Sequence, residues 1–141
     1  MREFTIIIGL SGEPRDTGAR VADVARQREA KPAETDARLA RLGELAAHGA
    51  HALARGSVRA LGPLLDAAQE DLAGLGLSTP RLDALIAAAR GAGALGAKLT
   101  GAGGGGAMIA LGPPGGDEAI LAALVGAGAH ARAVTLGGTP A

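Results

Sequence analysis

The sequence predicts a domain of the α+β class, because three kinds of pattern alternate along its 141 residues. Compact or β-branched apolar segments predict strands, and Leu and Ala at three- and four-residue steps predict amphipathic helices. Turns rich in Gly and Pro separate these segments. Hydrophobic residues make up 48% of the chain but Phe4 is its one aromatic residue, so we expect a core of Leu, Val, Ile and Ala between closely packed helices.

The elements can be placed in order along the chain. The predicted strands cover residues 4–8, 94–100, 108–111 and 131–136. The predicted helices cover residues 19–29, 39–53, 58–75, 82–89 and 117–125. The tail over residues 137–141 is expected to be loose. A chain of this length usually forms one domain, and no linker or repeat interrupts it, so residues 1–141 are interpreted as a single domain.

Proline and hydroxyl residues mark several helix boundaries. Pro32 is expected to separate the first two helices. Ser57 is placed to cap the third helix, which Pro63 can kink. Thr79 and Pro80 supply a cap and a first-turn proline for the fourth helix.

Composition excludes several classes of partner and site. Fourteen basic and fourteen acidic residues cancel, so no basic excess attracts nucleic acid or an anionic membrane, and we expect neither partner. Cysteine is absent, which excludes disulfides and thiolate metal ligands. The apolar run over residues 4–10 is too short for a signal or membrane segment. We therefore expect a cytoplasmic protein.

The most informative stretch runs from Lys98 to Gly106 and places five glycines in six positions. Five glycines cost about 3–5 kcal/mol of chain entropy relative to alanine, which is large beside domain stabilities of about 5–15 kcal/mol. Glycine tolerates positive φ and lets successive backbone N–H groups point into one concavity, where an anion can bind. This loop is therefore predicted to bind phosphate.

Two common nucleotide-binding motifs do not fit this loop. Gly101, Gly103 and Gly106 satisfy the dinucleotide pattern G-x-G-x-x-G, but that pattern requires a helix directly afterwards. Residues 108–111 instead form a short apolar segment halted by glycine and proline, which predicts a strand. In a Walker-type loop the lysine follows the glycines, whereas Lys98 precedes them.

Residues 98–111 closely resemble the third conserved motif of the GHMP kinases, the superfamily of galactokinase, homoserine kinase, mevalonate kinase and phosphomevalonate kinase. The Lys-Leu-Thr lead-in is most similar to that of the mevalonate kinases. Residues 8–12 with Asp16-Thr17 resemble the strand and threonine loop that open the C-terminal domain of that family, and residues 72–80 resemble its connector. The resemblance implies a ferredoxin-like domain with about four antiparallel strands and helices packed on one face.

The resemblance and the chemistry of the loop together give a candidate site. Its nucleotide-binding residues are Gly101, Gly103, Gly104, Gly105 and Gly106. Its substrate-binding residues are Thr17, Lys98, Thr100 and Ala102. Two of these have simpler interpretations, since Lys98 can be a solvated residue of an edge strand and Thr17 a turn or cap hydroxyl.

No metal site is predicted in this chain. His48 and His51 have the i, i+3 spacing of paired ligands, but no further ligand completes a shell. Glu13, Asp16 and Asp23 are interpreted as solvated charges of a loop and a helix start.

The chain departs from the family pattern in three places. Ala107 stands where the family usually carries cysteine, and Gly18 where it commonly carries lysine or arginine. The family's N-terminal domain, with the ATP phosphate loop, a magnesium-binding acidic residue and the catalytic aspartate, has no counterpart in the sequence. Phosphoryl transfer requires those groups.

The resemblance therefore implies the C-terminal half of an ATP-dependent mevalonate kinase, expected not to turn over alone. ATP and Mg²⁺ would be bound mainly by a separate N-terminal half, and the acceptor would be a small molecule such as mevalonate. A half enzyme exposes apolar surface and is expected to self-associate. The alternatives are a non-catalytic module that binds a small ligand, a subunit of a split kinase of galactokinase-like, heptose-kinase-like or phosphomevalonate-kinase-like type, and a truncated product without function.

Overall fold

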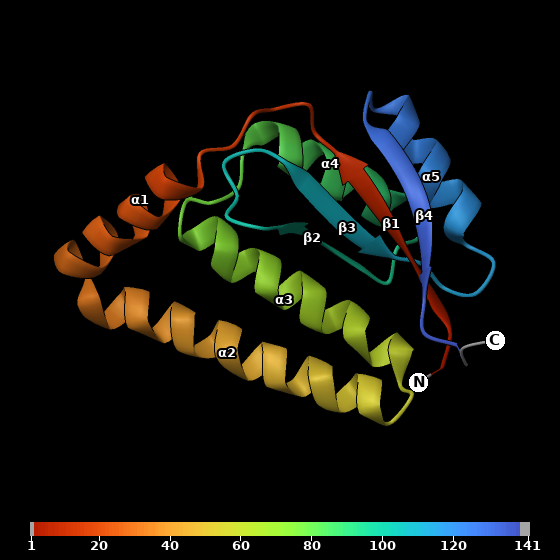
Figure 1. The fold of residues 1–141 in the computed structure, drawn as a ribbon, viewed down its shortest axis with the longest axis horizontal. Helices are drawn as coiled ribbons and strands as arrows, with labels where there is room; N and C mark the ends of the chain where they lie inside the picture. Colours follow the sequence, from red (N-terminus) through yellow and green to blue (C-terminus); the bar gives the residue numbers. More distant parts are fainter. Residues whose placement is uncertain (1, 139–141) are drawn as a thin grey trace.

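A computed structural model describes residues 2–138 and has the predicted α+β architecture (Figure 1). The strands are β1 (Phe4–Leu10), β2 (Gly96–Thr100), β3 (Ala107–Leu111) and β4 (His130–Leu136). The helices are α1 (Thr17–Ala30), α2 (Pro32–Ala54), the short 3₁₀ helix η1 (Val58–Ala60), α3 (Leu61–Gly74), α4 (Pro80–Gly91) and α5 (Asp117–Gly126). In the part of the chain that the structure describes, none of these helices is long and apolar enough to cross a membrane.

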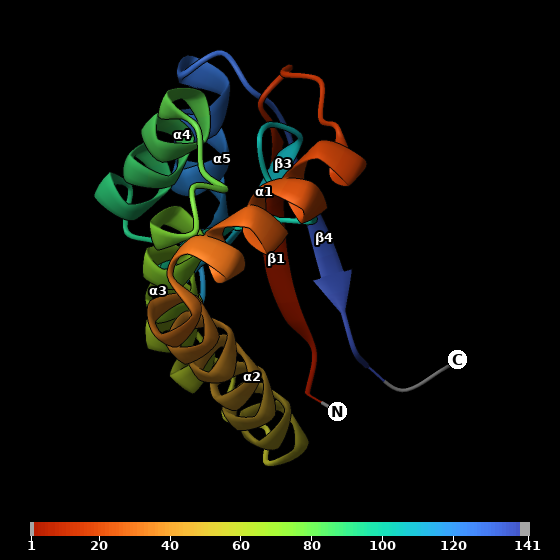
Figure 2. The same cartoon turned by 90° about the vertical axis from the view of Figure 1, so that its left-hand side faces the viewer.

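The four strands form one antiparallel sheet in the order β2-β3-β1-β4. The central strands β1 and β3 place Ile7 opposite Ala110, and β2 places Leu99 opposite Met108. Figure 2 shows α3, α4 and α5 on one side of the sheet. This order and this one-sided cover confirm the predicted ferredoxin-like fold.

The core lies between the sheet and helices α4 and α5. Every second residue of a strand points to the same face, and the strand residues that face the helices are buried. The largest fully buried core side chains are Ile7, Leu82, Leu85, Leu99, Met108, Ile120 and Leu124. As predicted, the Thr79 hydroxyl caps α4 by accepting a hydrogen bond from the Leu82 amide at 3.1 Å, and Pro80 is the first helical residue.

Helix α3 covers the free edge of the sheet at β2. Asp66 Oδ1 accepts a hydrogen bond from the Ala97 amide at 3.0 Å, and Gln69 Oε1 accepts one from the Leu99 amide at 2.8 Å. Arg90 Nη2 donates to the Ala97 carbonyl at 3.1 Å. An unpaired strand edge can recruit another chain, so these side chains satisfy the edge and close it.

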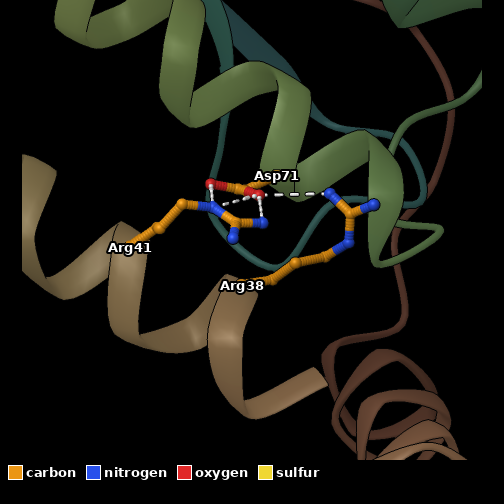
Figure 3. Close-up of polar contacts among 3 residues, drawn as sticks. All are labelled: Arg38, Arg41 and Asp71. Carbon is orange, nitrogen blue, oxygen red and sulfur yellow. Dashed lines mark hydrogen bonds and ion pairs between the residues drawn. The ribbon is translucent and has the colours of Figure 1, made fainter. Parts of the chain in front are cut away.

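Helices α1 and α2 form a hairpin, of which α2 packs along the outside of α3, and Pro32 begins α2 as predicted. A charge cluster joins α2 to α3 (Figure 3). Asp71 of α3, whose side chain is 7% exposed, accepts hydrogen bonds from Arg41 Nη2 at 2.7 Å and from Arg38 Nη1 at 3.1 Å. The hydrogen bond from Arg41 is the main cause that lowers the pKa of the Asp71 carboxyl, Arg38 lowers it further, and burial opposes both.

The third helix differs from the prediction. Ser57 makes no side-chain cap, and the η1 turn precedes α3, so the regular helix begins at Leu61. Pro63 then lies in the first turn of α3. Backbone N–H groups of this turn have no acceptor within the helix, so a proline here removes no helical hydrogen bond and the helix does not have to kink. The tail predicted over residues 137–141 lies outside the described residues from position 139 onward.

Candidate functional site

Four connecting segments meet at one end of the sheet. They are residues 11–16 after β1, residues 75–79 before α4, residues 101–106 between β2 and β3, and residues 127–129 before β4. The Gly104 amide donates to the Leu77 carbonyl at 2.7 Å, and the Gly106 amide donates to the Glu13 carbonyl at 3.1 Å. The antiparallel pairing of β1 with β3 brings the first and third segments together. The glycine loop is therefore held on both sides by other segments.

All five glycines of the loop have positive φ. Their φ angles are 78° at Gly101, 80° at Gly103, 70° at Gly104, 140° at Gly105 and 76° at Gly106. Space is also restricted, because a Cβ on Gly103 would overlap the Leu77 carbonyl oxygen and one on Gly105 would lie 2.5 Å from the Pro14 carbonyl oxygen. The glycine cluster is thus required by both the backbone conformation and the close packing of the neighbouring loops.

The amides of the loop serve two purposes. Those of Gly104 and Gly106 donate to protein carbonyls and hold the loop in place. Within residues 2–138, no protein group accepts a hydrogen bond from the amides of Gly101, Ala102, Gly103 and Gly105. Of these four residues, Gly101 is exposed, Ala102 is half-buried, and Gly103 and Gly105 are buried. Unpaired N–H groups of a glycine loop can bind an anion.

Lys98 and Thr100 lie on β2, immediately before the loop. Lys98 is half-buried, and its Nζ donates to the Leu99 carbonyl at 2.6 Å on the free edge of the strand. Burial lowers the pKa of the Lys98 ammonium. Lys98 thus lies on the edge strand, as its simpler interpretation states, but it is half-buried and not fully solvated. Thr100 ends β2 opposite Ala107, and Ala102 lies half-buried within the loop.

Thr17 is the first residue of α1 and is exposed. The cap of this helix is Asp16, whose Oδ1 accepts a hydrogen bond from the Ala19 amide at 3.0 Å. The hydroxyl of Thr17 is therefore not needed as the helix cap. The preceding segment, residues 13–15, lies against the glycine loop.

β3 follows the loop directly, as predicted, so the local structure is strand, glycine loop, strand. This arrangement differs from the dinucleotide fingerprint, which needs a helix at that point. The family model for the C-terminal region of GHMP kinases ("GHMP kinases C terminal") matches residues 50–130, more than half of the chain. The chain belongs to the GHMP kinase family.

Individual relatives of this GHMP kinase chain are mevalonate kinases. The chain is 37% identical over 131 residues to mevalonate kinase of Thermococcus gammatolerans, and this match covers 89% of the chain and 39% of that protein. It is 39% identical over 116 residues to mevalonate kinase of Pyrococcus abyssi, covering 79% of the chain and 35% of that protein. The chain thus spans about two fifths of the length of these relatives or less.

A solved structure shows the same fold. Mevalonate kinase of Leishmania major, in complex with R-mevalonate, superposes with a TM-score of 0.92 at 23% identity. The match covers 100% of this chain and 44% of that one. The ferredoxin-like arrangement of this GHMP kinase domain is therefore present within a complete mevalonate kinase structure.

Two arginines at the glycine loop of this GHMP kinase domain were missed by the sequence analysis. Arg15 Nη1 lies 2.6 Å from the position that a Cβ would occupy on Gly101, and its Cδ lies 3.1 Å from that position on Gly106. Arg20 of α1 lies over Gly104, with Nε and Nη1 each 3.3 Å from the Cβ position. More than 80 residues separate these arginines from the loop in sequence, so only the pairing of β1 with β3 brings them together.

Glu13 ties two of the loops together. Its Oε1 accepts a hydrogen bond from the Thr79 hydroxyl at 2.6 Å, and its side chain is half-buried, so its interpretation as a solvated charge was wrong. Arg81 adds a second tie by donating to the carbonyl oxygens of Ser11 at 3.3 Å and Ala127 at 2.6 Å. The loops at this end of the sheet are therefore positioned by side chains as well as by backbone.

A shallow depression lies beside these loops. Its volume is about 510 Å³, and Leu10, Glu13, Pro14, Arg15, Gly106 and Ala107 line it. A second cavity of about 440 Å³ lies around Phe4 and Val58 at the opposite end of β1, away from the glycine loop. The depression beside Arg15 is therefore the hollow that belongs to the candidate site.

The described residues do not assemble a metal site. Among residues 2–138, no three His, Cys, Asp or Glu side chains gather as a ligand set. His48 and His51 are exposed on α2, and Asp23 pairs with Arg20 and Arg26.

Proposed function

We propose that this chain is the C-terminal half of an ATP-dependent mevalonate kinase. The observation that carries the proposal is the strand, glycine loop, strand unit, in which four backbone N–H groups are left without a protein acceptor within residues 2–138. The identity of 37–39% to archaeal mevalonate kinases supports mevalonate as the acceptor. The reaction is transfer of a phosphoryl group from ATP to a hydroxyl of this small molecule.

In this proposal the loop residues have divided roles. The amides of Gly101, Gly103 and Gly105 bind phosphate oxygens, and those of Gly104 and Gly106 hold the loop in its binding conformation. Thr100, Ala102 and Thr17 contact the acceptor, and Lys98 contributes positive charge near its anionic groups. Such preformed donors stabilise charge that develops in phosphoryl transfer without reorganisation.

The remaining groups would come from a separate N-terminal half. Phosphoryl transfer also needs a nucleotide phosphate cradle, Mg²⁺ ligands and a group that orients the acceptor hydroxyl. Because the chain spans about two fifths of its relatives or less, we assign ATP and Mg²⁺ binding mainly to that half. The proposed reaction takes place in the cytoplasm, and the chain alone gives no turnover.

Three apolar side chains of the domain are exposed. Val21 of α1 is 64% exposed, Val125 of α5 55% and Leu10 of β1 50%. A second half that packed on this domain could cover such side chains. We propose that the chain self-associates in isolation and that the N-terminal half suppresses this self-association.

The test is reconstitution from two halves. The chain is purified alone and after co-expression with the segment of Thermococcus gammatolerans mevalonate kinase that precedes the matched region. Each sample is assayed with ATP and R-mevalonate, phosphomevalonate or galactose, and its oligomeric state is measured by sedimentation. We expect mevalonate phosphorylation only when both halves are present.

Three results would contradict parts of the proposal. Turnover by the chain alone would contradict its role as a half enzyme. Preferred phosphorylation of galactose by the pair would support the galactokinase-like alternative. An assembled pair that binds but phosphorylates none of the three acceptors would favour a non-catalytic module.

A further inference from the structure

The cavity of about 440 Å³ lies at the end of the sheet opposite the glycine loop. Three segments line it: residues 2–5 at the start of β1, residues 56–59 between α2 and η1, and residues 111–114 at the end of β3. Leu95 and Asp117 complete the lining. No residue of the glycine loop takes part, so the proposed phosphoryl transfer does not use this cavity.

Close backbone contacts fix one wall of the cavity. A Cβ on Gly96 would overlap the Gly62 carbonyl oxygen, and one on Gly62 would overlap the Leu95 carbonyl oxygen, so α3 and β2 touch directly here. The Leu95 amide donates to the Leu111 carbonyl at 2.7 Å and joins this wall to the end of β3. The cavity is therefore formed before any ligand enters, and its volume is in the usual range for small-molecule sites.

Much of the lining is apolar. It includes Phe4, Val58, Leu95, Leu111 and Pro113. Leu111 is buried and the other four are half-buried, so their apolar atoms still face open space. A hydrocarbon chain or ring placed among them would leave water, which is favourable in proportion to the area that is covered.

Two arginines lie on the η1 side of the cavity. The stem of Arg2 lies against Gly56, with Cδ 3.5 Å and Cγ 3.7 Å from the Cβ position of that glycine. Arg59 lies on η1, and both arginines line the cavity and are exposed. Within residues 2–138, no carboxylate forms an ion pair with either of them. Both guanidinium groups are therefore available to an anion.

The two carboxylates of the lining lie elsewhere around it. Glu3 Oε2 is 3.4 Å from the Cβ position of Gly138, which follows β4. Asp117 begins α5, where a carboxylate interacts favourably with the N-terminal end of the helix. The positive charge is therefore concentrated on the η1 side, and the negative charge is not.

We propose that this cavity is a second ligand site, which binds a free amphipathic anion. The apolar chain or ring of the ligand lies among Phe4, Val58 and Leu111, and its carboxylate or phosphate group lies at Arg2 and Arg59. The site is independent of the proposed kinase function.

The test measures binding to the 141-residue chain itself. Amide ¹H–¹⁵N shifts of Val58, Gly112 and Asp117 are followed during titration with hexanoate, octanoate, octyl phosphate, octylammonium and inorganic phosphate. We expect octanoate and octyl phosphate to shift these amides, with affinity rising about fourfold for each methylene added between hexanoate and octanoate. Octylammonium and inorganic phosphate should leave the three amides unchanged, because each lacks one of the two features of the ligand.

Charge variants test the headgroup contact. Arg2→Gln and Arg59→Gln should each weaken octanoate binding about three- to fivefold, as for an exposed ion pair. The matched control is Arg55→Gln, which removes the same charge from an exposed residue that does not line the cavity and should leave the affinity unchanged.

Four results would overturn the second site. They are absence of octanoate binding, equal binding of octylammonium, unchanged affinity in both Arg2→Gln and Arg59→Gln, and loss of binding when the chain is co-expressed with the N-terminal half. The last result would show that the other half occupies the cavity. Retention of octanoate binding in the co-expressed pair would support the site.

Discussion

At the scale of single residues, the site divides into parts that local sequence predicts and parts that it does not. The five glycines were predictable, because a cluster of this density points to positive φ and close backbone approach wherever the chain folds. The hydrogen bonds donated by the Gly104 and Gly106 amides could not be predicted, because their acceptors, the carbonyls of Leu77 and Glu13, lie on other segments of the chain. Arg15 and Arg20 were missed for the same reason.

The strictest requirement for glycine is at Gly103. Replacement by alanine combines an unfavourable positive φ with overlap between the new Cβ and the Leu77 carbonyl oxygen. We expect Gly103→Ala to lower the free energy of unfolding by about 3 kcal/mol. Urea denaturation followed by circular dichroism measures this change.

Gly12→Ala is the matched control for that substitution. Gly12 has nearly the same φ, 79°, but its added Cβ meets nothing within 4 Å. It should therefore lose only the conformational part, about 1 kcal/mol. Equal losses in the two variants would show that the Leu77 contact does not constrain the loop.

At the scale of elements, sequence predicted those with strong local signals. Helix α4 matched because Thr79 and Pro80 fix its start and its buried residues follow helical spacing. The start of the third helix was predicted at Val58, whereas the regular helix begins at Leu61. The prediction relied on Ser57, which is a residue type that often caps helices but makes no side-chain cap here. The placement of α3 along the β2 edge was beyond prediction, since it depends on which side chains of α3 reach the strand.

Substitution of Gln69 tests whether α3 closes the β2 edge of the sheet. It is buried, accepts from the Leu99 amide at 2.8 Å and donates to the Ser78 hydroxyl at 3.2 Å. Gln69→Leu leaves the Leu99 amide without an acceptor, so we expect unfolding free energy to fall by about 2 kcal/mol and amide exchange at Leu99 to accelerate. Hydrogen exchange observed by NMR measures both effects.

Two further variants test whether the Gln69 side chain is what protects the Leu99 amide from exchange. Gln69→Glu keeps an acceptor for Leu99 and should retain more amide protection than Gln69→Leu. Glu70→Leu changes an exposed neighbour on the same helix and should leave that protection unchanged. Protection at Leu99 that persists in Gln69→Leu would mean that α3 does not close the sheet edge through this contact.

At the scale of the whole molecule, the α1–α2 hairpin contacts the rest of the domain in two places. Helix α1 reaches the loops directly, where Gln27 donates to the Leu75 carbonyl and Arg20 lies over Gly104, and α2 packs against α3. The sheet and α4–α5 form the core around the candidate site, whereas α2 packs against α3 on the far side from the strands (Figure 1). Asp71 is the buried charge at this junction, and it faces Arg38 and Arg41 (Figure 3). The packing of α2 against α3 should therefore depend on ionisation of Asp71.

The pH dependence follows from the direction of the pKa shift. The pKa of Asp71 is lower in the folded chain than in the unfolded chain, where it is about 3.9. The unfolded state therefore binds a proton first as the pH falls, so the stabilisation is complete above about pH 4 and is lost as the pH passes through the lower folded pKa. Because both arginines reach solvent, with side chains 27% and 52% exposed, the pair contributes less than a fully buried one.

Asp71→Asn removes this charge with little change of shape. We expect it to lower the free energy of unfolding by about 1–2 kcal/mol at pH 7, since the two arginines lose their shared carboxylate. The difference from the unaltered chain should shrink as the pH falls below about 4, because the unfolded state of the unaltered chain then binds a proton that the folded state takes up only at a lower pH. Urea denaturation across this range measures it, with Glu70→Gln on the exposed face of α3 as the control. A difference that stays constant down to pH 2 would show that shape or hydrogen bonding, and not the carboxylate charge, joins the hairpin to α3.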